Sequence, residues 1–161
     1  MYSISTIQPH LPDANRPRDQ TPYYTIDEKR EWAAAVAART TGFLPLCIDH
    51  AGGERPDAPL NAKGEFEVPP ERQIGRMVDA LVRPNGDLLG VSELFYDRPE
   101  THGIIDDLNA GKRWGVSLCT NLKVLEAEGR VLDKRITHLG VTRDPEFGPE
   151  NAWIHYAHTS W

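Results

Sequence analysis

Three residues in this sequence are of the types that build a nucleophilic catalytic site: His50, Ser117 and His138. A serine hydroxyl is a poor nucleophile at neutral pH, because it needs a nearby imidazole to accept its proton. A third group must hold that imidazole in the correct tautomer, and a second histidine can fill this role. Taken singly, a strand histidine is more often a hydrogen-bonded structural residue, and a strand serine is often only a small one.

The three residues fall on predicted strands or at strand ends. The apolar run 43–48 predicts a strand, and His50 follows at its end. Residues 114–120 alternate, so Ser117 should point away from the bulky apolar side chains of its own strand. His138 should likewise point away from the two apolar residues that alternate with it. These patterns place all three side chains on strands of one sheet system.

The remaining pattern predicts a fold of the α+β class that is mainly antiparallel β. We expect a closed or strongly curled β-barrel with peripheral helices. Residues 1–22 have little apolar periodicity and are expected to form a flexible N-terminal arm, with residues 23–161 forming a single protease-like domain. The expected elements are a helix from about 28 to 39, a surface loop over 51–70, a hairpin of 74–82 with 87–96 around Asn85-Gly86, a helix from Pro99 to Gly111, and a hairpin of 122–125 with 131–142.

Composition excludes several other classes of function. Its 161 residues suit one domain, and 24 acidic against 18 basic residues give a net charge of −6, which disfavours nucleic acid as a ligand. Cys47 and Cys119 show no C-x-x-C spacing, and His155 and His158 have no carboxylate at ligand spacing, so we expect no metal and no cofactor. No apolar run is long enough to span a membrane and no secretory signal is evident, so we expect an intracellular protein without a membrane partner.

The contexts of the three residues resemble those of the herpesvirus-type capsid maturation proteases, the assemblin family. A looser similarity extends to the prohead proteases of tailed phages. The resemblance covers about residues 43 to 143 and lies in five segments: Leu44-Pro-Leu-Cys-Ile-Asp-His50, Ile74-Gly-Arg-Met-Val-Asp-Ala-Leu, Gly86-Asp-Leu-Leu-Gly-Val, Trp114-Gly-Val-Ser-Leu-Cys-Thr and Ile136-Thr-His-Leu-Gly-Val.

The resemblance implies a serine endopeptidase in which Ser117 is the nucleophile, His50 the general base and later acid, and His138 the group that orients His50. It implies cleavage of a scaffold protein, and of the enzyme's own precursor, during maturation of a viral capsid. Scaffold and capsid proteins would be the partners. The protein would then act inside the assembling capsid of an infected cell, in the nucleus for a herpesvirus-like system or in the cytoplasm for a phage-like one.

The sequence also departs from the family in two respects. The family carries an arginine-rich segment after its second histidine, whereas this chain has only Arg143 there, which is the candidate oxyanion residue beside nearby backbone amides. The helices that build the family's active dimer would follow this region, so a homodimer stays open. Cys119 is an alternative nucleophile. The alternative function is a catalytically silent protease-fold module that binds a capsid, portal or scaffold partner.

Overall fold

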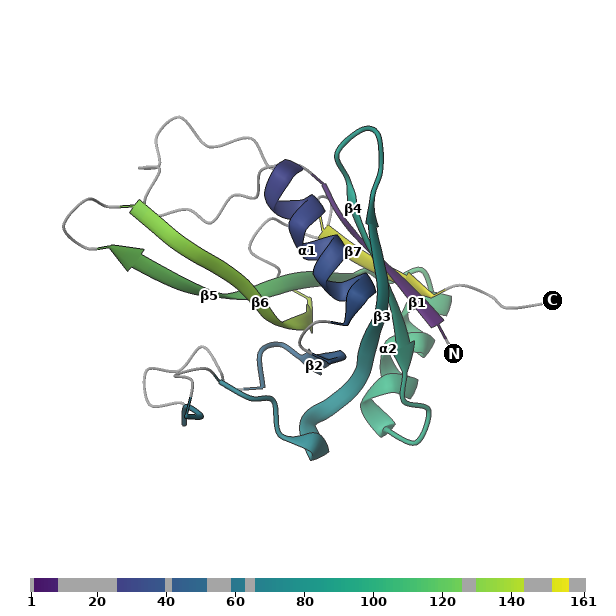
Figure 1. Ribbon diagram of the computed structural model, residues 1–161. Coiled ribbons are helices and arrows are strands. Elements are labelled where there is room, and N and C mark those ends of the chain that lie inside the picture. The colour runs from purple at the N-terminus through teal and green to yellow at the C-terminus, as the bar shows by residue number, and fades with distance from the viewer. Residues whose placement is uncertain are drawn as a thin grey trace.

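The computed structural model describes residues 2–8, 26–39, 42–51, 59–62, 66–125, 130–143 and 152–156 (Figure 1). Among them, no helix is long and apolar enough to cross a membrane. The elements in chain order are β1 (Tyr2–Ile7), α1 (Ile26–Ala38), β2 (Leu44–Ile48), a 3-10 turn (Pro70–Arg72), β3 (Gln73–Val82), β4 (Leu88–Leu94), α2 (Pro99–Asn109), β5 (Trp114–Leu125), β6 (Arg130–Thr142) and β7 (Ala152–Tyr156).

The seven strands form a closed barrel in the order β1-β4-β3-β2-β6-β5-β7. Every neighbouring pair is antiparallel except β2 and β6, which run parallel. This confirms the predicted mainly antiparallel barrel with two helices. The parallel pair requires a long crossover, and the chain between β2 and β6 supplies it through the β3–β4 hairpin, α2 and β5.

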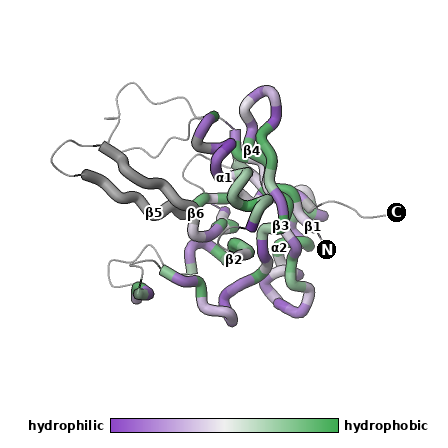
Figure 2. The backbone as a smooth tube through the Cα atoms, in the orientation of Figure 1, coloured by the Kyte–Doolittle hydropathy of each residue, from purple (hydrophilic) through white to green (hydrophobic). Residues whose placement is uncertain are grey.

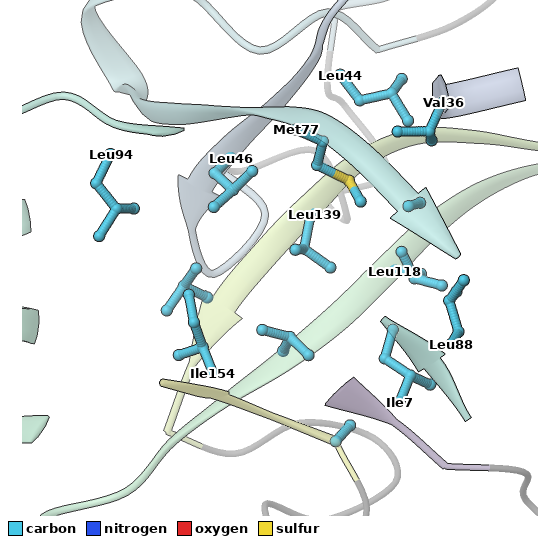
Figure 3. Close-up of a cluster of buried hydrophobic side chains, with 14 of the residues drawn as sticks. Ile7, Val36, Leu44, Leu46, Met77, Leu88, Leu94, Leu118, Leu139 and Ile154 are labelled. Carbon is cyan, nitrogen blue, oxygen red and sulfur yellow. The ribbon is translucent and has the colours of Figure 1, made fainter. Parts of the chain in front are cut away.

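The barrel is filled by side chains from alternate positions of its strands. On β5 and β6 the buried positions include Val116, Leu118, Leu139 and Val141, which face each other across the strand pair. Figure 3 shows Leu46, Met77 and Leu139 meeting in this core, with Val36 of α1 beside Met77 and Leu44. Because the core uses one parity of each strand, the other parity is left to face outward.

Helix α1 is anchored to the barrel by a buried lysine. Lys29 shares a helix face with the core residues Trp32 and Val36 and is fully buried. Its ammonium donates to the carbonyl oxygens of Ile7 (3.3 Å) and Gly86 (3.2 Å). Burial lowers the pKa of Lys29 from 10.5 to about 8, against an opposing effect of Asp87. The side chain ties α1 to the end of β1 and to the β3–β4 turn, where hydrophilic residues gather in Figure 2.

The N-terminal boundary expected from the sequence is wrong for Tyr2–Ile7. These residues form β1, which pairs with β4 on one side and β7 on the other, so the barrel begins at Tyr2 and not after 22. The inward positions include Ser3 and Ser5, whose small polar side chains hide the strand alternation in the sequence. The rest of the expected arm, residues 9–22, lies outside the described residues. Strand β7 was not predicted at all.

Strands β5 and β6 extend past the barrel as a two-stranded ribbon (Figure 1). β7 pairs with β5 only at Trp114 and Gly115, and β2 pairs with β6 only over 139–141. In the described part of the chain, β5 therefore has no second neighbour from Val116 onward. Ser117 lies at this point, where the barrel wall becomes a ribbon.

Candidate active site

His50 lies on a tight turn that directly follows β2. The amide of Asp49 donates to the carbonyl of Val141 on β6 (2.9 Å), and that of Ala51 donates to Ile48 (3.1 Å). Asp49 and Ala51 both have left-handed backbones, with φ of 51° and 52°. Left-handed conformations in residues other than glycine are costly and need support from their surroundings. The turn bends the chain at the strand end, so that the His50 ring returns over β6.

The ring of His50 lies directly over Gly140 of β6. A Cβ atom at Gly140 would stand 2.1 Å from the carbonyl oxygen of Asp49 and 3.0 Å from both Nδ1 and Cε1 of His50. No real Cβ fits so close to a backbone oxygen, so this position requires glycine. The sequence analysis did not identify Gly140 as part of the site, because its role depends on the parallel pairing of β2 with β6.

His50 and His138 are joined by a hydrogen bond between His50 Nδ1 and His138 Nε2, 2.9 Å apart. Their ring centroids are 5.0 Å apart at an interplanar angle of 66°. His138 is fully buried, whereas His50 is partly exposed. Burial, and second the neighbouring His50, lowers the pKa of His138 from 6.5 to about 4. At neutral pH His138 is therefore an uncharged partner for His50.

Two further residues complete the surroundings of His138. The Phe66 ring lies 6.1 Å from the His138 ring, centroid to centroid, at 69°. The Thr137 hydroxyl lies 3.3 Å from His138 Nδ1 and is hydrogen-bonded to it. Neither residue was singled out from the sequence. Thr137 precedes a candidate histidine, which was a signal that could have been used, but Phe66 comes from a distant loop and only the fold brings it here.

Ser117 lies on the same outer face of the barrel as this pair of histidines. Its neighbours Val116 and Leu118 are buried in the core, so Ser117 points outward, as predicted. It is directly opposite Gly140 across the β5–β6 ladder. Residues directly opposite in an antiparallel pair share a face, with Cα atoms about 4.5–5.5 Å apart. The register thus brings Ser117 beside the residue that the His50 ring covers, although no hydrogen bond joins the Ser117 hydroxyl to His50.

Arg143, the candidate oxyanion residue, lies just past the end of β6. Its guanidinium is 2.9 Å from an Asp107 carboxylate oxygen, and its Cζ atom lies 4.9 Å from the centroid of the Trp114 ring. Asp107 also accepts a hydrogen bond from the Trp114 indole (3.0 Å). The side chain of Arg143 thus joins α2 to the beginning of β5, and its role toward an oxyanion stays a prediction. The side chain of Cys119, the alternative nucleophile, lies outside the described part of the chain.

This arrangement suits proton transfer at His50. Its Nδ1 is occupied by His138, which leaves Nε2 as the nitrogen that can accept a proton from a hydroxyl. Because His138 is neutral and fully buried, it can accept a hydrogen bond from His50 without competing for a proton in neutral solution. A buried imidazole pair beside an outward-facing serine has the parts of a base-assisted nucleophile.

Comparison with known proteins bears on the fold. No protein-family model matches the chain, and no curated protein matches its sequence. Among solved structures, the chain is similar to KSHV protease, as seen in its complex with a hexapeptide phosphonate inhibitor, with a TM-score of 0.50 and 11% identity. The alignment covers 98% of this chain and 66% of the KSHV protein, so the chain spans somewhat less than two thirds of that structure. At this identity the likeness establishes a shared protease fold.

Proposed function

We propose that this chain is a serine endopeptidase with a Ser117-His50-His138 triad. The single observation that carries the proposal is the 2.9 Å hydrogen bond between His50 and the buried His138, set over a glycine directly opposite Ser117. A buried histidine pair at a strand crossing is costly to build, since each ring must keep its nitrogens bonded. The likeness to the fold of KSHV protease supports the same assignment.

In the proposed reaction, Ser117 Oγ attacks the carbonyl carbon of the scissile peptide bond and its proton moves to His50 Nε2. The resulting imidazolium is held through Nδ1–H by His138 Nε2. When the tetrahedral intermediate collapses, the C–N bond breaks and the leaving amine takes the proton from His50. Water then hydrolyses the acyl ester by the same steps in reverse order of roles.

The free edge of β5 supports a peptide as the substrate. From Val116 onward, no described strand occupies the side of β5 that faces away from β6. An extended peptide can add to such an edge through main-chain hydrogen bonds, which places one of its carbonyls beside the strand's own side chains. For the biological substrate we propose a scaffold protein and the enzyme's own precursor, cleaved within an assembling viral capsid.

A second candidate is the catalytically silent module that binds a capsid, portal or scaffold partner. Two observations favour it: the Ser117 hydroxyl has no hydrogen bond to His50 among the described residues, and the Arg143 guanidinium is already paired with Asp107. Both are also compatible with an enzyme whose contacts tighten only when substrate binds.

Labelling with a fluorophosphonate probe separates the two candidates. The probe forms an Oγ–P bond with an activated serine and releases fluoride, while the serine proton passes to the base. We expect labelling of the wild type, none of Ser117→Ala, and a loss of at least about 100-fold in His50→Gln, as for a general base. His155→Gln, an exposed histidine away from the site, is the matched control. Equal labelling of wild type and Ser117→Ala would exclude the triad.

A further inference from the structure

The hydrogen bonds around His138 continue past the two histidines to a third residue. Thr137 Oγ1 lies 3.3 Å from His138 Nδ1, and His138 Nε2 lies 2.9 Å from His50 Nδ1. The three groups form one chain of hydrogen bonds, with the buried imidazole in its middle. The direction in which the hydrogens point along this chain decides which nitrogen of His50 is free to act as a base.

Two directions are available while both rings are neutral. If Thr137 donates to His138 Nδ1, then His138 Nε2–H donates to His50 Nδ1, and the hydrogen of His50 is on Nε2. In that state Nε2 cannot accept a proton. If instead His138 Nδ1–H donates to Thr137, then His138 Nε2 accepts from His50 Nδ1–H, and His50 Nε2 carries the free lone pair.

Only the second direction survives when His50 becomes charged. An imidazolium carries hydrogens on both nitrogens, so His50 Nδ1–H must donate and His138 Nε2 must accept. Neutral His138 then carries its hydrogen on Nδ1, and this buried N–H needs an acceptor. The Thr137 hydroxyl is the acceptor recorded at that nitrogen. Phe66, on another side of the ring, offers none.

We propose that Thr137 is a positioning residue that fixes His138 in its Nδ1–H tautomer and so directs proton uptake to His50 Nε2. The proposal deepens the function proposed above and rests on it for its catalytic consequence. Its tautomeric part, however, concerns the free protein and can be measured without any substrate or probe.

The test uses long-range ¹H–¹⁵N correlation spectra of the full chain labelled with ¹⁵N-histidine, in wild type, Thr137→Val and Thr137→Ser. Valine keeps the shape of threonine and suits a strand, but it has no hydroxyl. We expect the Nδ1–H tautomer of His138 in wild type and Thr137→Ser, and a mixture or the Nε2–H tautomer in Thr137→Val. Fluorophosphonate labelling should fall about fivefold in Thr137→Val, the worth of one neutral hydrogen bond, and return in Thr137→Ser.

The outcomes separate this proposal from the proposed function. An Nε2–H tautomer in the wild type, or the same Nδ1–H tautomer in Thr137→Val, overturns the role of Thr137 whatever the labelling shows. The expected tautomers with no labelling of any protein would support the role of Thr137 and count against the peptidase. A melting curve for each variant checks that Thr137→Val is folded, and Thr137→Ser provides the second variant if it is not.

Discussion

Two parts of the barrel wall bury polar side chains under opposite conditions. On β6, His138 is fully buried and both of its ring nitrogens are hydrogen-bonded. On β1 and β4, the hydroxyls of Ser3, Ser5 and Ser92 are buried, and none has a hydrogen-bond partner among the described residues. The first group is a connected network on the outer face of the wall, and the second lines the interior.

The difference lies in what each side chain is there to do. Ser3 stands directly opposite Ser92, and Ser5 opposite Gly90, where an added Cβ would come within 2.8 Å of Met77 Cε. Small side chains at these positions leave room for Met77, and one unpaired hydroxyl costs about 1–3 kcal/mol. An imidazole brings two polar nitrogens and more volume, so its burial needs partners on both sides. The serines are explained by packing, whereas the histidine needs a further reason.

The pH dependence of stability should sharpen this contrast most. The pKa of His138 is about 4 in the folded protein against 6.5 as its ordinary value, so the unfolded chain binds the extra proton between these limits. The contribution of His138 to stability is therefore complete above pH 6.5, is lost as the pH falls toward 4, and amounts to about 3 kcal/mol. It should be measured by chemical unfolding of wild type and His138→Gln over this range.

The quantity to compare is the difference between the two unfolding curves, because the acidic residues titrate in both proteins. Wild type should lose about 3 kcal/mol more than His138→Gln between pH 6.5 and 4. His155→Gln should follow the wild-type curve, since this imidazole is exposed. Parallel curves for wild type and His138→Gln would mean that His138 is not held neutral by burial.

Gly140→Ala should break the site while leaving the barrel folded. The new methyl group would meet the Asp49 carbonyl and the His50 ring, so the turn after β2 must move outward. Overpacking of this kind costs about 1–3 kcal/mol. A shift of about 1 Å in a catalytic group can cost about 100-fold in rate. We expect fluorophosphonate labelling to fall by this order, with a moderate loss in the free energy of unfolding.

The matched control is Gly103→Ala in α2, where a Cβ meets nothing within 4 Å. Alanine in a helix is favoured over glycine by about 0.5–1 kcal/mol, so this variant should be slightly more stable and label normally. If Gly140→Ala labels as fast as Gly103→Ala, the position of the His50 ring over β6 does not matter for the reactivity of Ser117.

Local pattern was enough to predict much of the fold. The β3–β4 hairpin around Asn85-Gly86, the helix opened by Pro99 and the outward direction of Ser117 follow from turn chemistry and two-residue alternation. Strand β1 was missed because its inward residues include serines, and β7 because its five residues, Ala152–Tyr156, give too short a pattern. The closure of the barrel depends on both of these strands.

The candidate site shows a similar division. His50 and His138 were paired through a family resemblance, and their 2.9 Å contact agrees with it. Gly140, Thr137 and Phe66 were not found, because their roles arise from the parallel approach of β2 to β6 and from a loop distant in the chain. Neither relation leaves a periodic signal, since both join segments far apart in sequence.

The smallest expected effect concerns the unpaired serines. Ser92→Ala removes a fully buried hydroxyl that has no partner, so it should leave the free energy of unfolding unchanged or raise it by up to about 1 kcal/mol. Thr101→Val is the matched control: this hydroxyl is equally buried but donates to the carbonyl of Ile74 (3.4 Å). It should cost about 1 kcal/mol. Both values come from denaturant unfolding at neutral pH.

A loss of stability in Ser92→Ala as large as that in Thr101→Val would contradict the contrast between the two parts of the wall. It would mean that the hydroxyls facing each other on β1 and β4 are hydrogen-bonded, either to each other after a small rotation or through an internal water, which typically makes about three such bonds. Ser3→Ala together with Ser92→Ala then decides between packing and bonding. Additive, near-zero changes indicate small residues chosen for space, whereas a coupling of about 1 kcal/mol indicates a shared polar contact.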